Sequence, residues 1–172
     1  MWKWIAIILG LVCAAFIAIG FFKPEVSVVN STVINRSPEV VWRVFTDTAR
    51  AKEWMTGLDS IQTISGGHLQ PGSVHKLVFI DSGRRMDLTE TMTAVEPNRL
   101  FAFDSSMEEM HGTTNVILAP KDAGTTLTFE SVYHGNSIVW RSMMVVMQHS
   151  IEERGSNDLA KLKLLVEKEP AG

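Results

Sequence analysis

The first apolar segment constrains this chain more than any other feature. Nineteen consecutive residues, from Trp4 to Phe22, carry no charge. A helix rises about 1.5 Å per residue, so this run would cover about 28 Å, close to the ~30 Å hydrocarbon core of a bilayer. Lys3 and Lys23 bracket the run, and aromatic residues stand at both of its ends, as in helices that cross membranes. The sequence therefore predicts a transmembrane anchor over residues 1–24.

The same segment admits a second interpretation, a secretory signal that is removed. A short basic start precedes the apolar run, and Ala18, Ile19 and Gly20 loosely resemble a cleavage site. The apolar core of a signal is usually about 7–15 residues long, however, and this run is longer. We expect a single-pass membrane protein that keeps its anchor, with cleavage as the alternative. The charges that flank the run are nearly balanced, so the side of the membrane stays open.

Composition limits the partners of the remaining part, a predicted domain over residues 25–169. Without Lys3 the chain has 15 Lys and Arg against 19 Asp and Glu, and it shows no basic stripe that could neutralise phosphates. The five histidines lack the paired spacing of metal ligands, and the single cysteine, Cys13, lies in the apolar run. We therefore expect no nucleic-acid partner, no metal and no cofactor.

Turn signals and residue alternation predict a β-rich domain that ends in a long helix. Gly, Pro, Asn and Asp residues divide the middle of the chain into short segments that alternate or are rich in β-branched residues. We expect seven strands, near residues 26–35, 59–65, 73–80, 84–95, 99–105, 109–119 and 125–134. We also expect short helices near residues 38–47 and 48–54, and an amphipathic helix over residues 137–167. Strands joined as hairpins favour an antiparallel meander with one buried face.

The stretch from Ser31 to Trp54, with the order of the later elements, resembles the SRPBCC superfamily of START-like or polyketide-cyclase-like domains. The residues that carry the resemblance are Ile34, Pro38, Glu39, Val41, Trp42, Thr46, Asp47, Trp54, Gly72, Ser73 and the terminal helix from Leu159 to Glu167. The resemblance covers about residues 26–167. It implies an α+β helix-grip fold, in which a curved seven-stranded antiparallel sheet surrounds the long C-terminal helix and leaves an apolar cavity. Many relatives bind lipids, sterols, quinones or polyketides, and some are enzymes.

Alternation selects the side chains that we expect to line such a cavity. Along the segment 84–95, even-numbered residues are mostly apolar and odd-numbered residues are polar, so the even face should point inward. The expected lining, extended to the neighbouring strands and the helix, is Met86, Leu88, Glu90, Met92, Phe101, Phe103, Met110, Val116, Leu118, Leu127, Phe129, Met143, Met144 and Met147. Methionine adapts to guests of different shape, although a methionine stripe at helical spacing is more often ordinary core than a binding site.

Glu90 is the most informative polar position, because it stands on this apolar face between Leu88 and Met92. A carboxyl group buried there would need a partner or a raised pKa, and such groups concentrate at functional sites. A register slip or an ion pair at the rim is the alternative. Polar groups from three further residues could also reach the cavity, but the alternation in their strands does not choose a face. These residues are His111, Glu130 and Tyr133.

Three functions follow from this reasoning. We expect first that the protein binds or presents a hydrophobic small molecule, such as a lipid, isoprenoid or polyketide, without catalysing a reaction on it. Its second partner is the lipid bilayer. The second possibility is an enzyme of the cyclase, dehydratase or hydrolase kind, with Glu90 as general acid or base. The third is a protein interaction module like the chaperone activators of the superfamily, which would have a filled interior and an exposed apolar patch.

Gly155 interrupts the apolar face of the predicted C-terminal helix. Glycine inside a helix costs about 1 kcal/mol relative to alanine. We therefore expect that the helix approaches the sheet closely there, leaves room for a guest, or bends or breaks near Arg154 and Ser156.

Overall fold

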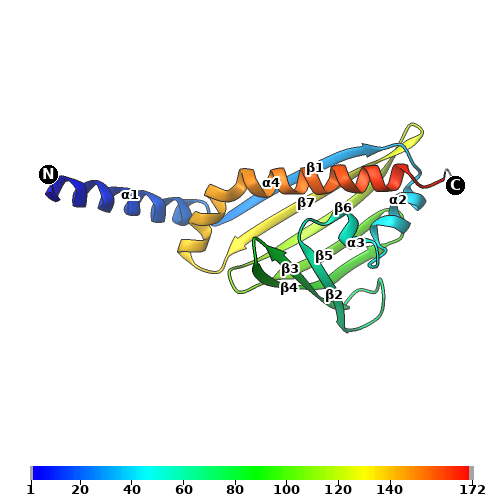
Figure 1. Cartoon of the computed structure of the whole chain (residues 1–172), viewed down its shortest axis with the longest axis horizontal. Helices are drawn as coiled ribbons and strands as arrows, with labels where there is room; N and C mark the ends of the chain where they lie inside the picture. Colours follow the sequence, from blue (N-terminus) through cyan, green and yellow to red (C-terminus); the bar gives the residue numbers. More distant parts are fainter. Residues whose placement is uncertain (1, 171–172) are drawn as a thin grey trace.

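Seven strands form one antiparallel sheet, which confirms the predicted fold class (Figure 1). The computed structural model describes residues 2–170. The strands are β1 (Glu25–Ile34), β2 (Leu58–Ser65), β3 (Val74–Asp81), β4 (Arg84–Glu96), β5 (Leu100–Ser106), β6 (Met110–Lys121) and β7 (Gly124–Gly135). Their order in the sheet is β1-β7-β6-β5-β4-β3-β2. Strands β2 to β7 therefore pair with their neighbours in sequence, and β1 crosses over to pair with β7.

Four helices of the described chain accompany the sheet. They are α1 (Trp2–Phe22), α2 (Pro38–Phe45), α3 (Ala51–Trp54) and α4 (Ile138–Glu167), and α4 is much longer than α2 and α3. Helix α4 runs along β1 and β7, while α2 and α3 lie near its C-terminal half (Figure 1). Helix α3 is shorter than the predicted segment 48–54. The carboxylate of Asp47 accepts a hydrogen bond from the backbone N–H of Ala49 over 3.0 Å, and such a side-chain contact stabilises a turn rather than a helix.

A tightly filled region lies between α2, the C-terminal third of α4 and the sheet. We call this region the packed end. Its most buried side chains are at most 2% exposed and are Ile34, Val41, Val44, Val116, Leu118, Leu127, Leu162 and Val166. Burial of so many branched side chains anchors α4 to the sheet at this end.

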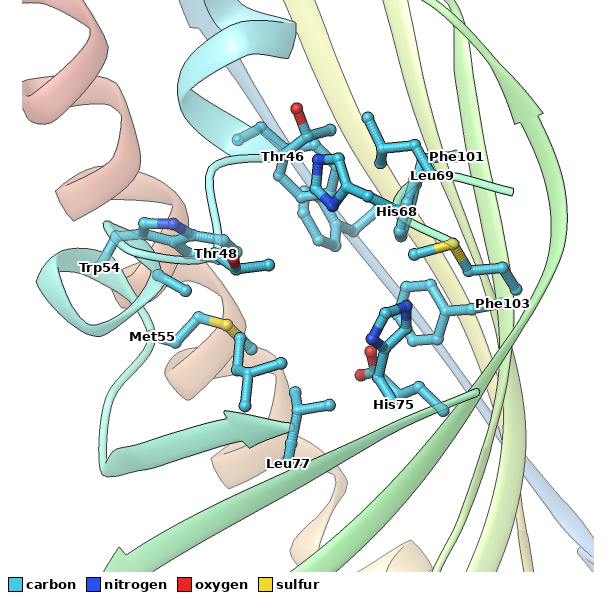
Figure 2. A pocket seen from close by; sticks show the side chains of 16 residues that line it. Thr46, Thr48, Trp54, Met55, His68, Leu69, His75, Leu77, Phe101 and Phe103 are labelled. Carbon is cyan, nitrogen blue, oxygen red and sulfur yellow. The ribbon is translucent and has the colours of Figure 1, made fainter. Parts of the chain in front are cut away.

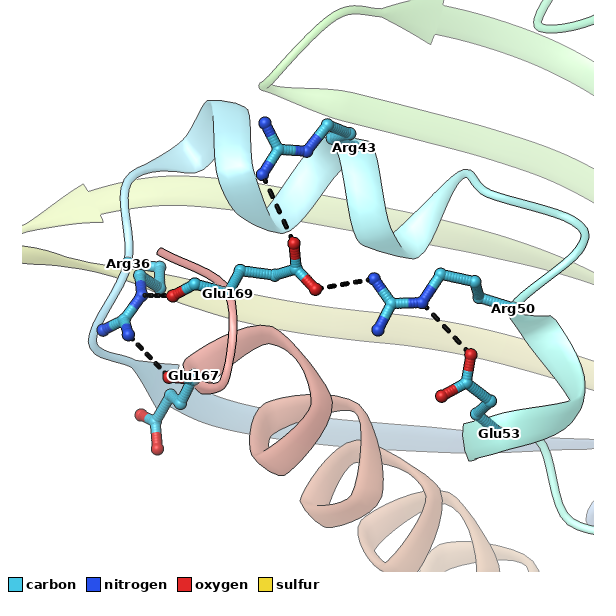
Figure 3. Close-up of polar contacts among 6 residues, drawn as sticks. All are labelled: Arg36, Arg43, Arg50, Glu53, Glu167 and Glu169. Atoms are coloured by element: carbon cyan, nitrogen blue, oxygen red, sulfur yellow. Dashed lines mark hydrogen bonds and ion pairs between the residues drawn. The ribbon is translucent and has the colours of Figure 1, made fainter. Parts of the chain in front are cut away.

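Arginine side chains secure the end of α4 next to the packed end (Figure 3). Arg50 forms an ion pair with the Glu169 carboxylate at 2.8 Å, and Arg43 approaches the same carboxylate at 3.6 Å. Arg36 donates hydrogen bonds to the backbone carbonyl oxygens of Glu167 and Glu169. Free carbonyl groups at a helix C-terminus attract cations. The Arg36 side chain therefore supplies hydrogen bonds that these carbonyl oxygens of α4 would otherwise lack.

Close approach of α4 to β1 explains Gly155. Helix α4 is continuous from Ile138 to Glu167, and a Cβ atom on Gly155 would overlap the side chain of Asn30 on β1. The Asn30 amide donates to the backbone oxygen of Glu152 at 2.9 Å and to Oγ of Ser156 at 2.8 Å. These bonds hold the middle of α4 against β1.

Helix α1 extends away from the domain and overlaps only the start of α4 (Figure 1). At the overlap the backbone N–H of Gly20 donates to Oγ of Ser142 at 3.0 Å, and a Cβ atom on Gly20 would collide with Ser142. Most of α1 is otherwise exposed. Within the described chain it is the one helix with the length and apolar character to cross a membrane, properties that a signal sequence near an N-terminus shares.

Candidate ligand-binding cavity

Two adjoining cavities lie between the sheet and the helices. The first, of about 110 Å³, lies beside α3, and we call it the α3 cavity. The second, of about 310 Å³, lies beneath the middle of α4, and we call it the α4 cavity. Five residues line both cavities: Trp54, Met55, Glu90, Phe103 and Phe129. Together the cavities reach the size of ordinary small-molecule sites, about 300–1,000 Å³.

Aromatic side chains form much of the wall of the α3 cavity. Phe45 of α2 lies edge-on to Phe101 and Phe129, with ring centroids 5.4 and 5.8 Å apart. Phe101 and Phe103 lie on the sheet side, and Trp54 and Met55 lie on the opposite side (Figure 2). This lining suits an apolar guest.

Glu90 reaches the interior, as the alternation along β4 predicted. Its side chain is half-buried and lines both cavities between Leu88 and Met92. Burial alone raises the pKa of the Glu90 carboxyl to about 7, because the apolar surroundings disfavour its charged form. Among residues 2–170, no lysine or arginine lines either cavity. Glu90 is therefore a carboxyl group that exchanges its proton near neutral pH.

His75 lies beside Glu90 on the adjacent strand. The two residues are direct partners in the β3–β4 ladder, and His75 is 5% exposed. Its Nδ1 atom lies 3.2 Å from Oγ1 of Thr63, while Nε2 has no hydrogen-bond partner among residues 2–170. Burial, and secondly the proximity of His68, lower the pKa of His75. The imidazole side chain points toward the cavity, and the ring of His68 lies above it in the view of Figure 2. The ring is thus neutral at pH 7 and keeps one nitrogen free.

Half of the residues expected on the cavity wall lie there. They are Leu88, Glu90, Met92, Phe101, Phe103, Met110 and Phe129. Three others, Val116, Leu118 and Leu127, belong to the packed end, because the sheet is filled by α2 and α4 at their level. Met86 is partly buried on β4 and lines neither cavity.

The methionines of α4 lie away from the cavities, against our expectation. Met144 packs on Val26 and Val28 of β1, Met143 is partly buried, and Met147 is 45% exposed. The first turns of α4 lie over the edge strand β1 rather than over the cavity. Residues of α4 reach the cavity wall from Ile151 onward.

The sequence reasoning missed His75, Trp54 and His68 as cavity residues. Alternation could have found His75, since it shares a face of β3 with Leu77. The loop that carries His68 offered no such pattern.

The three undecided polar residues have different positions. Tyr133 lines the α4 cavity. His111 stacks on His134 with ring centroids 5.2 Å apart, and its Nδ1 lies 2.7 Å from Oδ1 of Asn136. Glu130 is exposed. Only Tyr133 among them can contact a guest in the interior.

Solved structures share this fold at low sequence identity. The Zhui aromatase/cyclase from Streptomyces sp. R1128 is 15% identical, with a TM-score of 0.71 over 84% of this chain and 94% of that one. Ara h 8.0201 is 12% identical, with a TM-score of 0.70 over 84% of this chain and 99% of that one. Protein CV1439 from Chromobacterium violaceum is 19% identical, with a TM-score of 0.66 over 83% of this chain and 99% of that one.

Comparison with protein families agrees with the fold. No functionally curated protein matches the chain. The model of the family described as polyketide cyclase / dehydrase and lipid transport matches residues 25–167, which is nearly the whole of the α+β part. The chain therefore belongs to the polyketide cyclase / dehydrase and lipid transport family.

Proposed function

We propose that this protein binds a hydrophobic small molecule, of the lipid, isoprenoid or polyketide class, in the joined α3 and α4 cavities. The main observation behind this proposal is the pair of adjoining, largely apolar cavities. They share five lining residues and together have the size of a small-molecule site. Membership of a family described by cyclase, dehydrase and lipid transport activities supports the same class of guest.

The proposal includes a membrane anchor in α1. The Gly20–Ser142 contact fixes the end of α1 on the first turns of α4. Val139 and Val146, which are 50% and 61% exposed, lie on these same turns. A membrane that contains α1 would therefore lie next to an apolar part of the domain. A guest with low water solubility could then pass between bilayer and cavity over a short distance.

The α4 cavity extends toward this end of the domain. Met107 and Met110, on either side of the β5–β6 turn, line it. The amide of Asn136, two residues before α4, donates to the backbone oxygen of Met107 at 3.1 Å. The cavity wall and the start of α4 are thus directly linked.

Native mass spectrometry tests whether the cavities hold a guest. We expect delipidated full-length protein, soaked with membrane extract, to retain an apolar molecule. The Ile151→Trp substitution should reduce this retention, because Ile151 lines the α4 cavity and a larger side chain would fill it. Leu164→Trp is the matched control on the same helix, since Leu164 is 62% exposed. Protein that stays empty through several mild extractions would contradict the proposal.

A second candidate function is acid–base catalysis on the bound guest. The observation that favours it is the Glu90 carboxyl, whose pKa is raised to about 7 beside the neutral His75. Turnover of a guest by wild-type protein, lost in Glu90→Gln while binding persists, would support catalysis. Equal turnover in both proteins would eliminate this role of Glu90. The open interior does not favour the third possibility, an interaction module with a filled core.

A further inference from the structure

Strand register places a row of polar residues across the floor of the two cavities. His75 pairs with Glu90, Glu90 with Ser105, Ser105 with Gly112, and Gly112 with Tyr133. Directly paired residues in an antiparallel sheet point to the same face. His75 lines the α3 cavity, Glu90 lines both cavities, and Ser105 and Tyr133 line the α4 cavity. We call His75, Glu90, Ser105 and Tyr133 the polar row.

Gly112 contributes no side chain to the row, and this leaves space for its neighbour. A Cβ atom on Gly112 would meet the Tyr133 ring at 2.7 Å. The ring therefore lies over the glycine. This position keeps Tyr133 on the line that continues from Glu90 and Ser105.

Part of the hydrogen-bonding capacity of the polar row is unused by the protein. The hydroxyl of Ser105 donates to the backbone oxygen of Gly112 at 3.4 Å. Nε2 of His75 is buried without a partner in the described part of the chain. Burial raises the pKa of the Glu90 carboxyl, and no charged neighbour or hydrogen bond within residues 2–170 lowers it. Nε1 of Trp54, on the opposite wall, is also buried and unpartnered within residues 2–170. Buried polar groups without partners are unfavourable, and a guest with matching groups would relieve that cost.

Charge restricts the kind of matching group. Neither cavity is lined by a lysine or arginine of the described part of the chain, and His75 is neutral at pH 7. An ionised carboxylate or phosphate on the guest would therefore have no cationic partner. An ammonium group on the guest could pair only with Glu90, whose apolar surroundings oppose ionisation, or with Asp158 on the α4 side. The Asp158 carboxylate already accepts a hydrogen bond from the backbone N–H of Thr56 at 3.1 Å and pairs with Lys161 at 3.5 Å. Uncharged oxygen groups remain as the best match.

We infer that the guest is an uncharged, largely apolar molecule that carries at least two hydroxyl or carbonyl oxygens along one edge, one at His75 and Glu90 and another at Tyr133. This inference deepens the proposed function and rests on it. Glu90 and Tyr133 stand three strands apart, which corresponds to about 14 Å at the usual strand spacing. The apolar edge of the guest then faces the aromatic side chains and α4. A lipid with a single polar end would satisfy only one end of the row.

A panel of probes with the same chain length tests this inference on the full-length protein. The probes are a saturated hydrocarbon, its primary alcohol, its carboxylic acid and a diol whose extended hydroxyls span the row. We expect the diol to bind most tightly and the alcohol next. The acid should bind at least about tenfold more weakly than the alcohol at pH 8, because a buried unpaired charge is costly. Competition with a fluorescent apolar probe measures these affinities.

Single substitutions locate the two ends of the row. Tyr133→Phe should weaken the diol about tenfold and leave the alcohol unchanged, because only the diol reaches that hydroxyl. Glu90→Leu should weaken both, whereas Glu90→Gln retains hydrogen bonding and should bind both. Thr113→Val on β6 is the matched control, since Thr113 is exposed on the opposite face. Thermal unfolding checks that each variant is folded.

The outcomes separate this inference from the proposed function. If none of the probes binds, including the hydrocarbon, both are wrong. If the hydrocarbon binds as tightly as the diol, or the acid binds best, the cavity accepts apolar guests without using the polar row. Tyr133→Phe that weakens the alcohol and the diol equally would likewise overturn the placement of the second oxygen.

Discussion

The packed end and the two cavities share one sheet and one helix, yet they are built differently. In the packed end, branched side chains such as Leu162 and Val166 are fully buried and fill the space between α2, α4 and the sheet. The α4 cavity lies a few residues earlier along α4, under the segment from Ile151 to Leu159. There the sheet carries half-buried aromatic and polar side chains that surround open volume. The comparison indicates that stability is concentrated at one end, which allows the rest of the interior to remain open.

Truncation in the packed end should have the largest effect on stability. Leu162 is 0% exposed, so Leu162→Ala removes buried methyl groups and leaves a hole. We expect it to lower the free energy of unfolding by about 2–5 kcal/mol. Urea unfolding of the protein in detergent measures this loss. Leu164→Ala, two residues away but 62% exposed, should change the value by less than about 0.5 kcal/mol. Similar losses in the two variants would remove the basis of the comparison.

The cavity should show the opposite behaviour at Glu90, where the native side chain costs stability. The pKa of Glu90 is raised from 4.5 in the unfolded chain to about 7 in the folded one, so folded protein holds the proton more tightly. The contribution of Glu90 to the free energy of unfolding therefore falls as pH rises from about 4.5 to about 7, by up to about 3 kcal/mol. The free energy of unfolding of Glu90→Gln should not show this decrease with pH.

His75 faces Glu90 and titrates in the opposite sense. The pKa of His75 is lowered in the folded protein, so the unfolded chain binds this proton more tightly. The contribution of His75 to the free energy of unfolding therefore rises as pH rises toward 6.5. We would therefore compare the free energy of unfolding of wild type with that of Glu90→Gln at each pH. Both proteins contain His75, so its effect cancels in the difference. A difference that stays constant from pH 4 to pH 8 would show that Glu90 is not held in apolar surroundings.

The ion pairs beside the packed end should have the smallest effect. Arg50 and Glu169 are 28% and 24% exposed in their side chains, and partly exposed pairs contribute about 1 kcal/mol or less. We expect Arg50→Ala to lower stability by about that amount. Arg43→Ala should cost less still, because Arg43 is 62% exposed and 3.6 Å from Glu169. Unfolding curves at low and high salt measure both variants. A loss as large as that of Leu162→Ala would mean that charge, rather than packing, holds this end of α4.

Periodicity in the sequence predicted the fold and part of the site. Alternation along β4 identified the inward face and placed Glu90 on it. The hairpin spacing predicted an antiparallel meander, which β2 to β7 form, but it did not predict that β1 pairs with β7. These features are local, so they can be recognised from neighbouring residues alone.

The remaining parts of the site depend on contacts between distant segments. The positions of α2 and α4 over the sheet decide whether Leu118 faces packed side chains or open volume. No local sequence pattern contains that information. The same holds for the methionines at the start of α4, which cover β1. Alternation along β3 could have placed His75 on the inward face, but its position beside Glu90 depends on the register between β3 and β4.

The contact between Asn30 and Gly155 has a mechanical consequence. Asn30 holds the middle of α4 against β1, and the packed end holds its last turns, so displacement of this helix would break contacts in both places. The segment between α3 and β2 is tied to the same helix, because Arg154 donates to the backbone oxygen of Thr56 at 2.6 Å and Asp158 accepts from the backbone N–H of Thr56 at 3.1 Å. The covering of the two cavities is thus braced on both sides of α4, which favours guests that fit the existing volume.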